Sequence, residues 1–252
     1  MAIWAIADLH LSFGLPDKGM EIFGDHWENH ARKIEAHWRK TIIPEDLILI
    51  PGDISWAMNL QQVQPDLDWI ESLPGTKVLL KGNHDYWWGS LQQIKRILPP
   101  SLHLIQNNVF SWNQVSIGGA RLWDTSEYQF GSYIEGLPHQ EETTEPNQKQ
   151  EEAEKIFARE LGRLELSLQQ LDQRPQVLRI AMTHYPPIGA ALRDSRVSAL
   201  LDRYQVDLCV FGHLHNVRKG SLPFGVHHGV EYALVACDYL NFEPKLLESE
   251  KR

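Results

Sequence analysis

The chain has 252 residues, of which 42% are hydrophobic and 23% are charged, a balance typical of globular proteins that excludes a largely disordered chain. Its longest apolar runs, such as residues 2–7, are too short to span a bilayer, and no basic segment precedes that run, so we expect neither membrane insertion nor a secretory signal. The formal net charge of −9 is opposite in sign to that of proteins that bind a nucleic-acid backbone by charge, so double-stranded nucleic acid is not an expected partner.

The first half of the chain alternates between apolar runs and helical patterns. Short apolar runs that end at turn or polar residues predict three buried strands, at residues 2–7, 46–50 and 76–80. Apolar residues at helical spacing predict helices at residues 27–38, 60–70 and 90–98. Asp25 is the expected N-cap of the first of these helices.

The middle of the chain changes in composition. Three shorter strands are predicted at residues 102–105, 109–112 and 115–118. From Glu135 to Glu154 the chain holds seven Glu and one Lys, a net charge of −6, so we expect a solvated acidic insertion there. A long helix should follow it, since apolar residues from Phe157 to Leu171 recur at steps of four and three.

The last third returns to alternating strands and helices. Strands are predicted at residues 177–182, 206–211 and 232–236, with a helix over residues 195–204. This alternation indicates an α/β fold, and we expect residues 1–252 to form a single domain. Cys209 and Cys237 lie in apolar runs, so we expect buried thiols and a cytoplasmic protein.

Asp, Asn and His residues follow five of the predicted strands. The motifs are Asp8-Leu9-His10, Gly52-Asp53, Gly82-Asn83-His84-Asp85, Thr183-His184 and Gly212-His213-Leu214-His215. Ligands of α/β sheets bind beyond the carboxyl ends of the strands, so these side chains should meet at one edge. Carboxylate oxygens and imidazole nitrogens suit hard to borderline divalent metals. By chance, such a chain would contain Gly-His-x-His roughly 0.04 times and Gly-Asn-His-Asp on the order of 0.002 times.

These five motifs, in this order, resemble the signature of the calcineurin-like metallophosphoesterases, and within them the branch of small bacterial predicted phosphohydrolases. The resemblance implies a four-layer α/β/β/α sandwich of two mixed sheets, with a dinuclear metal site at the carboxyl ends of the strands. It implies, by position, that Asp53 bridges two ions. It assigns Asp8, His10 and His215 to the first ion. It assigns Asn83, His184 and His213 to the second. The expected ions are Mn²⁺ or an Fe/Mn pair, with Zn²⁺ as an alternative.

The resemblance implies hydrolysis of phosphate esters. Two metal ions about 3.5–4 Å apart clamp an in-line displacement and acidify water, so that hydroxide is available at neutral pH. His84 would stay outside the ligand set and protonate the leaving group, and Asp85 would orient either His84 or a ligand histidine. The expected substrate is a phosphodiester or a small phosphomonoester, nucleotides included. Protein phosphatases of this superfamily carry an Arg shortly after Gly-Asp, whereas Gly52-Asp53 continues without one, which argues against a protein substrate.

Four further residues are candidate substrate contacts. Arg193 and Arg218 follow the His184 and His215 motifs and would contact phosphate, a solvated surface position being the alternative for each. Trp56 and Trp88 follow the Asp53 and His84 motifs and would form a wall for a flat or apolar substrate group. Loop packing over the floor of the site is the alternative for both tryptophans.

Two rival functions stay open. A lipid-linked nucleotide pyrophosphate hydrolase would need an apolar, membrane-facing cap, and the acidic insertion argues against docking on an anionic leaflet. A non-catalytic metal-binding scaffold would use the same cleft without turnover. Such scaffolds usually lack several metal ligands, and none is missing from this sequence.

Overall fold

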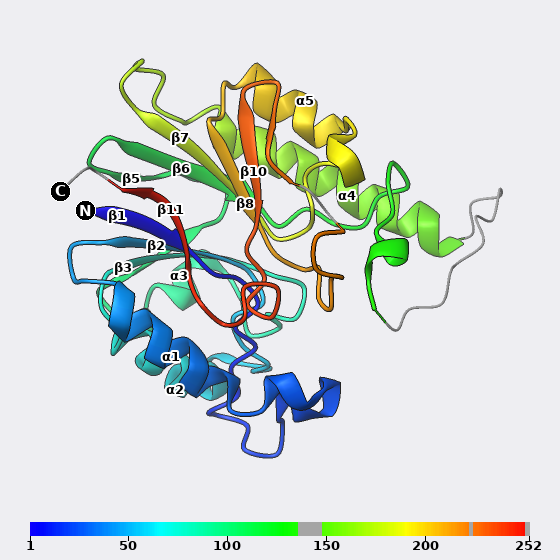
Figure 1. Cartoon of the computed structure of the whole chain (residues 1–252). Coiled ribbons are helices and arrows are strands. Elements are labelled where there is room, and N and C mark those ends of the chain that lie inside the picture. Colours follow the sequence, from blue (N-terminus) through cyan, green and yellow to red (C-terminus); the bar gives the residue numbers. More distant parts are fainter. Residues whose placement is uncertain (136–147, 222–223, 250–252) are drawn as a thin grey trace.

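The computed structural model describes residues 1–135, 148–221 and 224–249, and its strands form two mixed sheets that lie face to face (Figure 1). Most of the acidic insertion predicted over residues 135–154 lies outside the described residues. Residues 148–154 of it are described, and they form the start of a long helix.

The first sheet has the strand order β11-β1-β2-β3-β4. Its strands are β1 (Ala2–Ala5), β2 (Leu47–Pro51), β3 (Thr76–Leu80), β4 (Leu102–Ile105) and β11 (Lys245–Ser249). Strands β1 to β4 are parallel, and β11 pairs antiparallel with β1. Among the described residues, the α-helices of this half of the molecule are α1 (His30–Thr41), α2 (Leu60–Glu71) and α3 (Leu91–Ile94). Helices α1 and α2 cover its outer face (Figure 1).

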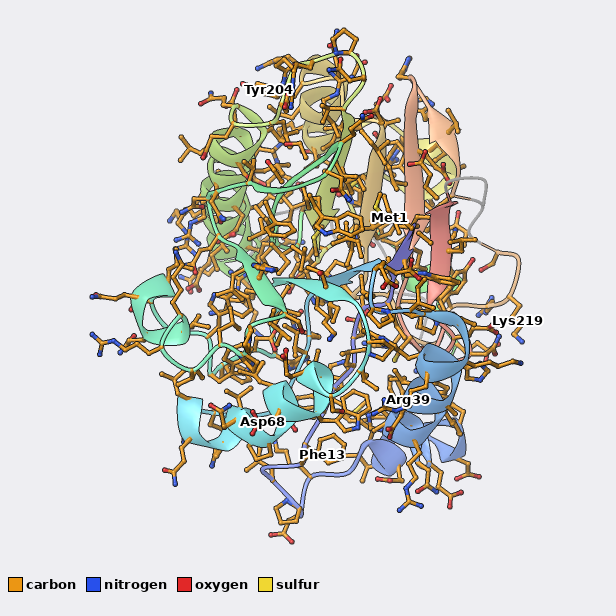
Figure 2. The ribbon with its side chains drawn as sticks, turned by 90° about the vertical axis from the view of Figure 1, so that its left-hand side faces the viewer. Met1, Phe13, Arg39, Asp68, Tyr204 and Lys219 are labelled. Atoms are coloured by element: carbon orange, nitrogen blue, oxygen red, sulfur yellow. The ribbon has the colours of Figure 1, made fainter. Side chains whose placement is uncertain are left out.

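The second sheet has the strand order β5-β6-β7-β8-β10-β9. Its strands are β5 (Phe110–Trp112), β6 (Val115–Ala120), β7 (Leu178–Thr183), β8 (Leu208–Phe211), β9 (Val226–His227) and β10 (Val230–Leu234). The inner four are parallel, and β5 and β9 pair antiparallel at the edges. Its outer face is covered by α4 (Gln148–Leu168) and α5 (Arg196–Arg203). Figure 2 shows Tyr204, after α5, and Asp68, on α2, on opposite sides of the molecule.

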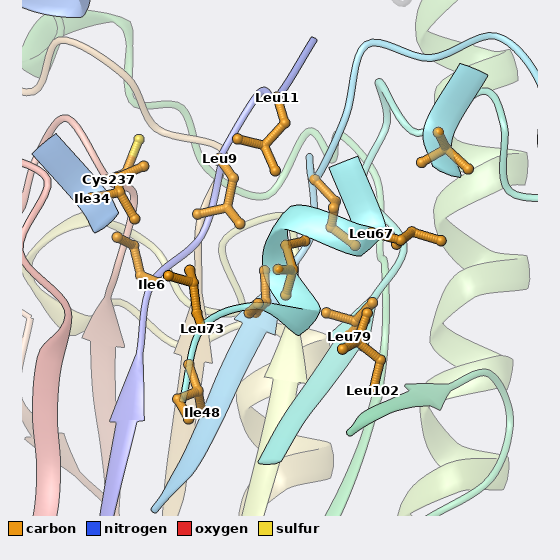
Figure 3. Packing of buried hydrophobic residues seen from close by; sticks show 14 of the residues in the cluster. Ile6, Leu9, Leu11, Ile34, Ile48, Leu67, Leu73, Leu79, Leu102 and Cys237 are labelled. Carbon is orange, nitrogen blue, oxygen red and sulfur yellow. The ribbon is translucent and has the colours of Figure 1, made fainter. Parts of the chain in front are cut away.

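The alternation of side chains along each strand explains the layers. Along β2, Leu47 and Leu49 pack between the two sheets, whereas Ile48 and Ile50 pack against the helices outside. Successive strand residues point to opposite faces, and both faces are covered, so every position of β2 is buried. Figure 3 shows Ile48 in the outer layer, with Leu67 of α2. The result is the predicted α/β/β/α sandwich.

The structure differs from the sequence predictions at several element boundaries. The predicted N-cap Asp25 is wrong, because Asp25 begins a short 3-10 helix (Asp25–Trp27) and Asn29, with a left-handed φ of 53°, separates that turn from α1. The helix predicted over residues 90–98 is helical only over α3. Strands β9 and β11 were not predicted, since β9 has two residues and β11 is a charged edge strand without a continuous apolar run. Within the described residues, no helix is both long and apolar enough to cross a bilayer.

Candidate metal centre

The seven predicted ligands come from both sheets. After the strands of the first sheet come Asp8, His10, Asp53 and Asn83, and after those of the second come His184, His213 and His215. Because β1, β2 and β3 are parallel, as are β7 and β8, their carboxyl ends deliver these side chains to one region. Asp8, Asp53 and His184 are almost fully buried there.

The three residues expected at the first ion lie together. His10 Nε2 is 3.2 Å from His215 Nε2, and His215 Nε2 is 3.9 Å from Asp8 Oδ1. One donor atom from each residue fits within a mutual distance of 4.8 Å. Three donors at this spacing can face a single cation.

The three residues expected at the second ion also lie together. Asn83 Oδ1 is 2.7 Å from His184 Nε2 and 3.1 Å from His213 Nδ1. Asp53 Oδ2 is 3.4 Å from His184 Nε2 and 3.7 Å from His10 Nε2, so it lies between the two groups. Asp8 also lies close to Asp53 and His184, and its carboxylate therefore borders both groups.

Strained backbone and close glycine contacts hold these side chains in place. Asp8, Asp53 and His213 have left-handed φ values of 59°, 51° and 70°, a conformation that L-residues rarely adopt outside functional sites. A Cβ on Gly82 would lie 2.1 Å from Asp53 Oδ1, and one on Gly212 would lie 2.3 Å from Asp8 Oδ2. The two motif glycines therefore leave the space that the carboxylates occupy.

The charges of the site favour a bound cation. Burial raises the pKa of Asp8 to about 7 and lowers the pKa of His10. For His184, burial acts against the charged form, but the Asp53 carboxylate outweighs it and raises the pKa to about 9. Within the described residues His10 Nδ1 is buried without a hydrogen-bond partner. Clustered buried groups of this kind are stabilised by a divalent ion, and the mixed oxygen and nitrogen donors fit one.

A cavity of about 800 Å³ borders the site beside His213. Aromatic side chains line much of it, among them Trp123, Tyr133 and Tyr185. The Tyr185 ring lies 3.9 Å from the His213 ring and 5.2 Å from the Trp123 ring, between centroids. Predicted Arg193 also lines this cavity. The space suits a substrate group next to the second set of ligands.

Residues 1–217 match the family model of the calcineurin-like phosphoesterases. The chain belongs to this family. This is the family that the five motifs predicted.

Two curated relatives of this chain are phage proteins that match one stretch of it. The Gene 66 protein of Mycobacterium phage L5 is 34% identical over 84 residues, and that of phage D29 is 30% identical over 83 residues. The stretches cover 32% and 33% of this chain and 39% and 40% of those proteins, so the chain spans about two fifths of their length. Among solved structures, phosphopantetheinyl hydrolase from Mycobacterium tuberculosis shares the fold, with a TM-score of 0.56 at 14% identity over 99% of this chain and 96% of that one.

The candidate metal centre includes a carboxylate that the sequence analysis missed. Asp238 follows β10, and its Oδ1 is 2.9 Å from His215 Nδ1, while its Oδ2 accepts a hydrogen bond of 2.8 Å from Asn216 N. A carboxylate in this place fixes the orientation of a ligand histidine. The available signal was its position, since Asp238 also follows a strand, but a lone Asp matches none of the five motifs.

His84 lies beside the two ligand groups rather than within them. Its backbone N donates a 2.8 Å hydrogen bond to Asp53 Oδ1, and its ring centroid is 5.7 Å from that of His10. Trp56 packs against both rings, at 4.6 Å from His84 and 4.9 Å from His10. Half-buried His84 therefore borders the site, with Trp56 limiting how its ring can turn.

The structure places Asp85 away from both roles expected of it. Its Oδ2 accepts from Gly82 N at 2.7 Å, and its Oδ1 accepts from Ile54 N, Ser55 N and the Trp87 indole at 2.9–3.1 Å. These four donors are backbone amides and a tryptophan rather than a histidine. Asp85 is fully buried and joins the loop after β2 to the loop after β3.

Two expected substrate contacts lie elsewhere. Trp88 is only 5% exposed and packs in the core beside Trp87, with 5.0 Å between ring centroids, so the alternative of loop packing describes it. Arg218 is exposed and does not line the large cavity, as the surface alternative expected. The sequence places both residues near the motifs, but the direction in which each side chain points depends on how the loops fold.

Proposed function

We propose that this protein is a metal-dependent phosphoesterase that hydrolyses phosphodiesters or small phosphomonoesters, nucleotides among them, with two metal ions. The observation that supports this proposal is the position of Asp53 Oδ2, 3.4 Å from His184 Nε2 and 3.7 Å from His10 Nε2. Asp8, His10 and His215 would hold one ion. Asn83, His184 and His213 would hold the other, with Asp53 between them. Mn²⁺ or an Fe/Mn pair suits these donors, with Zn²⁺ as an alternative.

When bound, the ions supply an acidified water and neutralise phosphate charge. The residues of the chain position the other participants. Asp238 and the Pro51 carbonyl hold the rings of His215 and His184 through their Nδ1 atoms. As the P–O bond of the ester breaks, His84 donates its proton to the leaving oxygen. We assign Asp85 a positioning role, since its hydrogen bonds hold the loop that carries His84.

Arg193 is the substrate contact that we retain at the large cavity. It lines this cavity together with His213 and Tyr185, and its guanidinium donates to the Glu127 carbonyl. A guanidinium held in this way can pair with an anionic group of the substrate. Trp56 would stack against a flat group on the other side of the site, next to His84.

A lipid-linked nucleotide pyrophosphate is a second candidate substrate, because exposed apolar side chains lie in the segments that follow β1 and β2. These side chains are Phe13 (48% exposed), Ile22 (83%), Phe23 (51%) and Met58 (55%). Phe23 stacks parallel to Trp56, with 6.3 Å between ring centroids, and so connects them to the site. Exposed apolar side chains of this kind suit such a substrate.

The decisive experiment is turnover of bis-p-nitrophenyl phosphate and p-nitrophenyl phosphate by protein stripped with chelator and reloaded with Mn²⁺. Wild type and His37→Ala, which removes a surface histidine of α1, should cleave the diester, and chelator should abolish the activity. Asp53→Asn should lose bound metal and activity together. His84→Ala should keep two ions per chain and lose about 10²–10⁴-fold in kcat.

If the loaded wild type binds two ions and cleaves neither ester, the non-catalytic scaffold becomes the better account. A cleavage assay with a nucleoside diphosphate-lipid in detergent micelles distinguishes the lipid-linked candidate from the soluble substrates. Faster cleavage of this lipid than of the soluble diester would favour it, whereas no cleavage would exclude it.

We further propose that residues 1–252 act as one domain in the cytoplasm, on a small phosphorylated substrate. Cys209 and Cys237 are buried free thiols, which suits a reducing compartment. The net charge of −9 disfavours double-stranded nucleic acid as a partner.

A further inference from the structure

A second cavity, of about 340 Å³, lies where the two sheets meet α4. Lys81, directly after β3, and Arg121, directly after β6, line it from the sheets. Arg159 and Arg163 line it from α4. None of these residues belongs to the candidate metal centre.

The charge of this cavity is opposite to that of the chain. Four cationic side chains line it, and Glu160 is the single carboxylate among its described lining residues. Four positive charges and one negative charge leave an excess of three positive charges, in a chain whose net charge is −9. Chance scatter of surface charge does not account for this concentration, because the cations come from three separate segments.

Glu160 neutralises only part of the positive charge. Its Oε1 is 2.6 Å from Arg163 Nη1, 3.5 Å from Arg121 Nη2 and 3.7 Å from Arg159 Nη2, and its side chain is 3% exposed. Lys81 Nζ instead donates to the Trp88 carbonyl, at 3.3 Å. A structural ion pair would explain one arginine on Glu160, but three arginines and a lysine around one carboxylate repel one another.

We propose that this cavity is a binding site for a phosphate-type anion. Guanidinium groups present paired N–H donors that match the oxygens of phosphate and sulfate, and lysine adds a point charge. A bound dianion would offset the excess positive charge and occupy the space between α4 and the two sheets. The cavity volume exceeds what one phosphate fills, so a group attached to the phosphate also fits.

The anion site adjoins the large cavity beside the metal centre. The Arg121 guanidinium lies 4.4 Å from the centroid of the Trp123 ring, and Trp123 lines the large cavity. Arg121 and Trp123 therefore form a shared wall between the two cavities. The anion is either a second phosphate of the substrate, which rests on the proposed function, or free inorganic phosphate, which does not.

Sulfate binding to metal-stripped protein tests the site without using the metal centre. Calorimetric titration should show one saturable sulfate per chain in the wild type. The double variant Arg159→Gln/Arg163→Gln should raise the Kd for sulfate at least tenfold. The control Arg174→Gln/Arg203→Gln removes two exposed arginines that pair with Asp172 and Glu165, and its Kd should match that of the wild type.

Lys81→Gln keeps the test interpretable if the double variant does not fold, since it leaves the Glu160 ion pairs in place. It should also weaken sulfate binding about tenfold. Absence of saturable sulfate binding in the wild type, or an unchanged Kd in Lys81→Gln and in a folded double variant, overturns the proposal.

Reloaded enzyme then distinguishes the two sources of the anion. If the bound anion is a second phosphate of the substrate, Lys81→Gln should raise the ratio of two KM values about tenfold. This ratio is the KM for adenosine 3′,5′-bisphosphate divided by the KM for adenosine 5′-monophosphate. With free phosphate as the source, this ratio equals that of the wild type while sulfate binding is still lost. If neither nucleotide is hydrolysed, the nucleotide part of the proposed function fails, and the sulfate titration still decides the anion site.

Discussion

His215, which belongs to one of the five motifs, forms a hydrogen bond with Asp238, which belongs to none of them. Their atoms Nδ1 and Oδ1 lie 2.9 Å apart, and although burial opposes the charged form, this hydrogen bond and the Asp8 charge raise the pKa of His215 to about 9. The carboxylate fixes which ring nitrogen faces the other ligands, since it accepts the proton of Nδ1. Asp238 is therefore a positioning residue of the candidate centre.

We expect Asp238→Asn to weaken Mn²⁺ binding by about 10–100-fold, because the His215 ring loses its orienting acceptor. Calorimetric titration of metal-stripped protein measures this directly. Asp172→Asn is the control, because Asp172 pairs with Arg174 at the surface and belongs to no candidate ligand group within the described residues. Equal Mn²⁺ affinities of Asp238→Asn and the control would contradict the orienting role.

Lys77 is a buried cation outside the site. It is 1% exposed on β3, and its Nζ donates to the Leu73 carbonyl and, at 3.0 Å, to Ser101 Oγ. Burial lowers the pKa of Lys77 to about 8. Between this pH and the ordinary lysine value of about 10.4, the unfolded chain binds more protons than the folded one, so stability rises with pH across that window.

We expect the free energy of unfolding of the wild type to rise by about 1–3 kcal/mol relative to that of Lys77→Met between pH 7.5 and pH 10. Urea unfolding at several pH values measures the difference in the free energy of unfolding between the two proteins. The contributions of titratable groups that both proteins share cancel in this difference. Lys40→Met, at an exposed position of α1, should follow the wild type. Parallel pH curves for the wild type and Lys77→Met would refute the assignment.

Helix α2 begins just after the loop that carries Asp53 and Trp56. Asn59 is its N-cap, and the Asn59 side chain accepts hydrogen bonds from Gln61 N and Gln62 N. These bonds satisfy backbone donors that the first turn of a helix leaves unpaired. The cap thus fixes where the loop after β2 ends and the helix starts.

We expect Asn59→Ala to lower the free energy of unfolding by about 1 kcal/mol, while Asn59→Ser keeps most of it. Urea unfolding measures both changes. The number of ions bound per chain should stay the same in both variants, because the cap touches no candidate ligand. Equal stability of Asn59→Ala and the wild type would argue against the cap.

The candidate ligands connect the two halves of the sandwich. Asp8, Asp53 and Asn83 extend from the first sheet, whereas His184 and His213 extend from the second. An ion held by both sets would resist separation of the sheets, in addition to the apolar layer between them. Binding to the folded state alone stabilises a protein by about 2.7 kcal/mol at a ligand concentration 100 times Kd.

We therefore expect Mn²⁺ to raise the Tm of metal-stripped wild type and to leave that of Asp53→Asn nearly unchanged. Differential scanning calorimetry with and without Mn²⁺ checks this outcome. Asp202→Asn, which removes an exposed carboxylate of α5, should respond as the wild type does. An equal rise in Asp53→Asn would place the stabilising ion elsewhere.

Local sequence patterns were sufficient for the order of most elements and for the five motifs. A strand such as β2 shows as a continuous apolar run because both of its faces are buried, and each motif sits where its strand ends. Both signals depend on neighbouring residues only. The edge strand β9 was missed because two residues are too few to show a pattern. The start of α1 was missed because the turn at Asn29 before it has no distinct sequence pattern.

The amino-acid sequence by itself determined the five motifs and the family that they indicate, because residue type and spacing along the chain carry that information. The sandwich and the seven ligand candidates followed from the resemblance to that family. Only the tertiary structure decided that Asp238 supports His215, that Asp85 ties two loops and that Trp88 lies in the core. It alone brought Lys81 and Arg121 to the arginines of α4. These contacts join segments far apart in the chain, and their geometry depends on how the two sheets pack rather than on local periodicity.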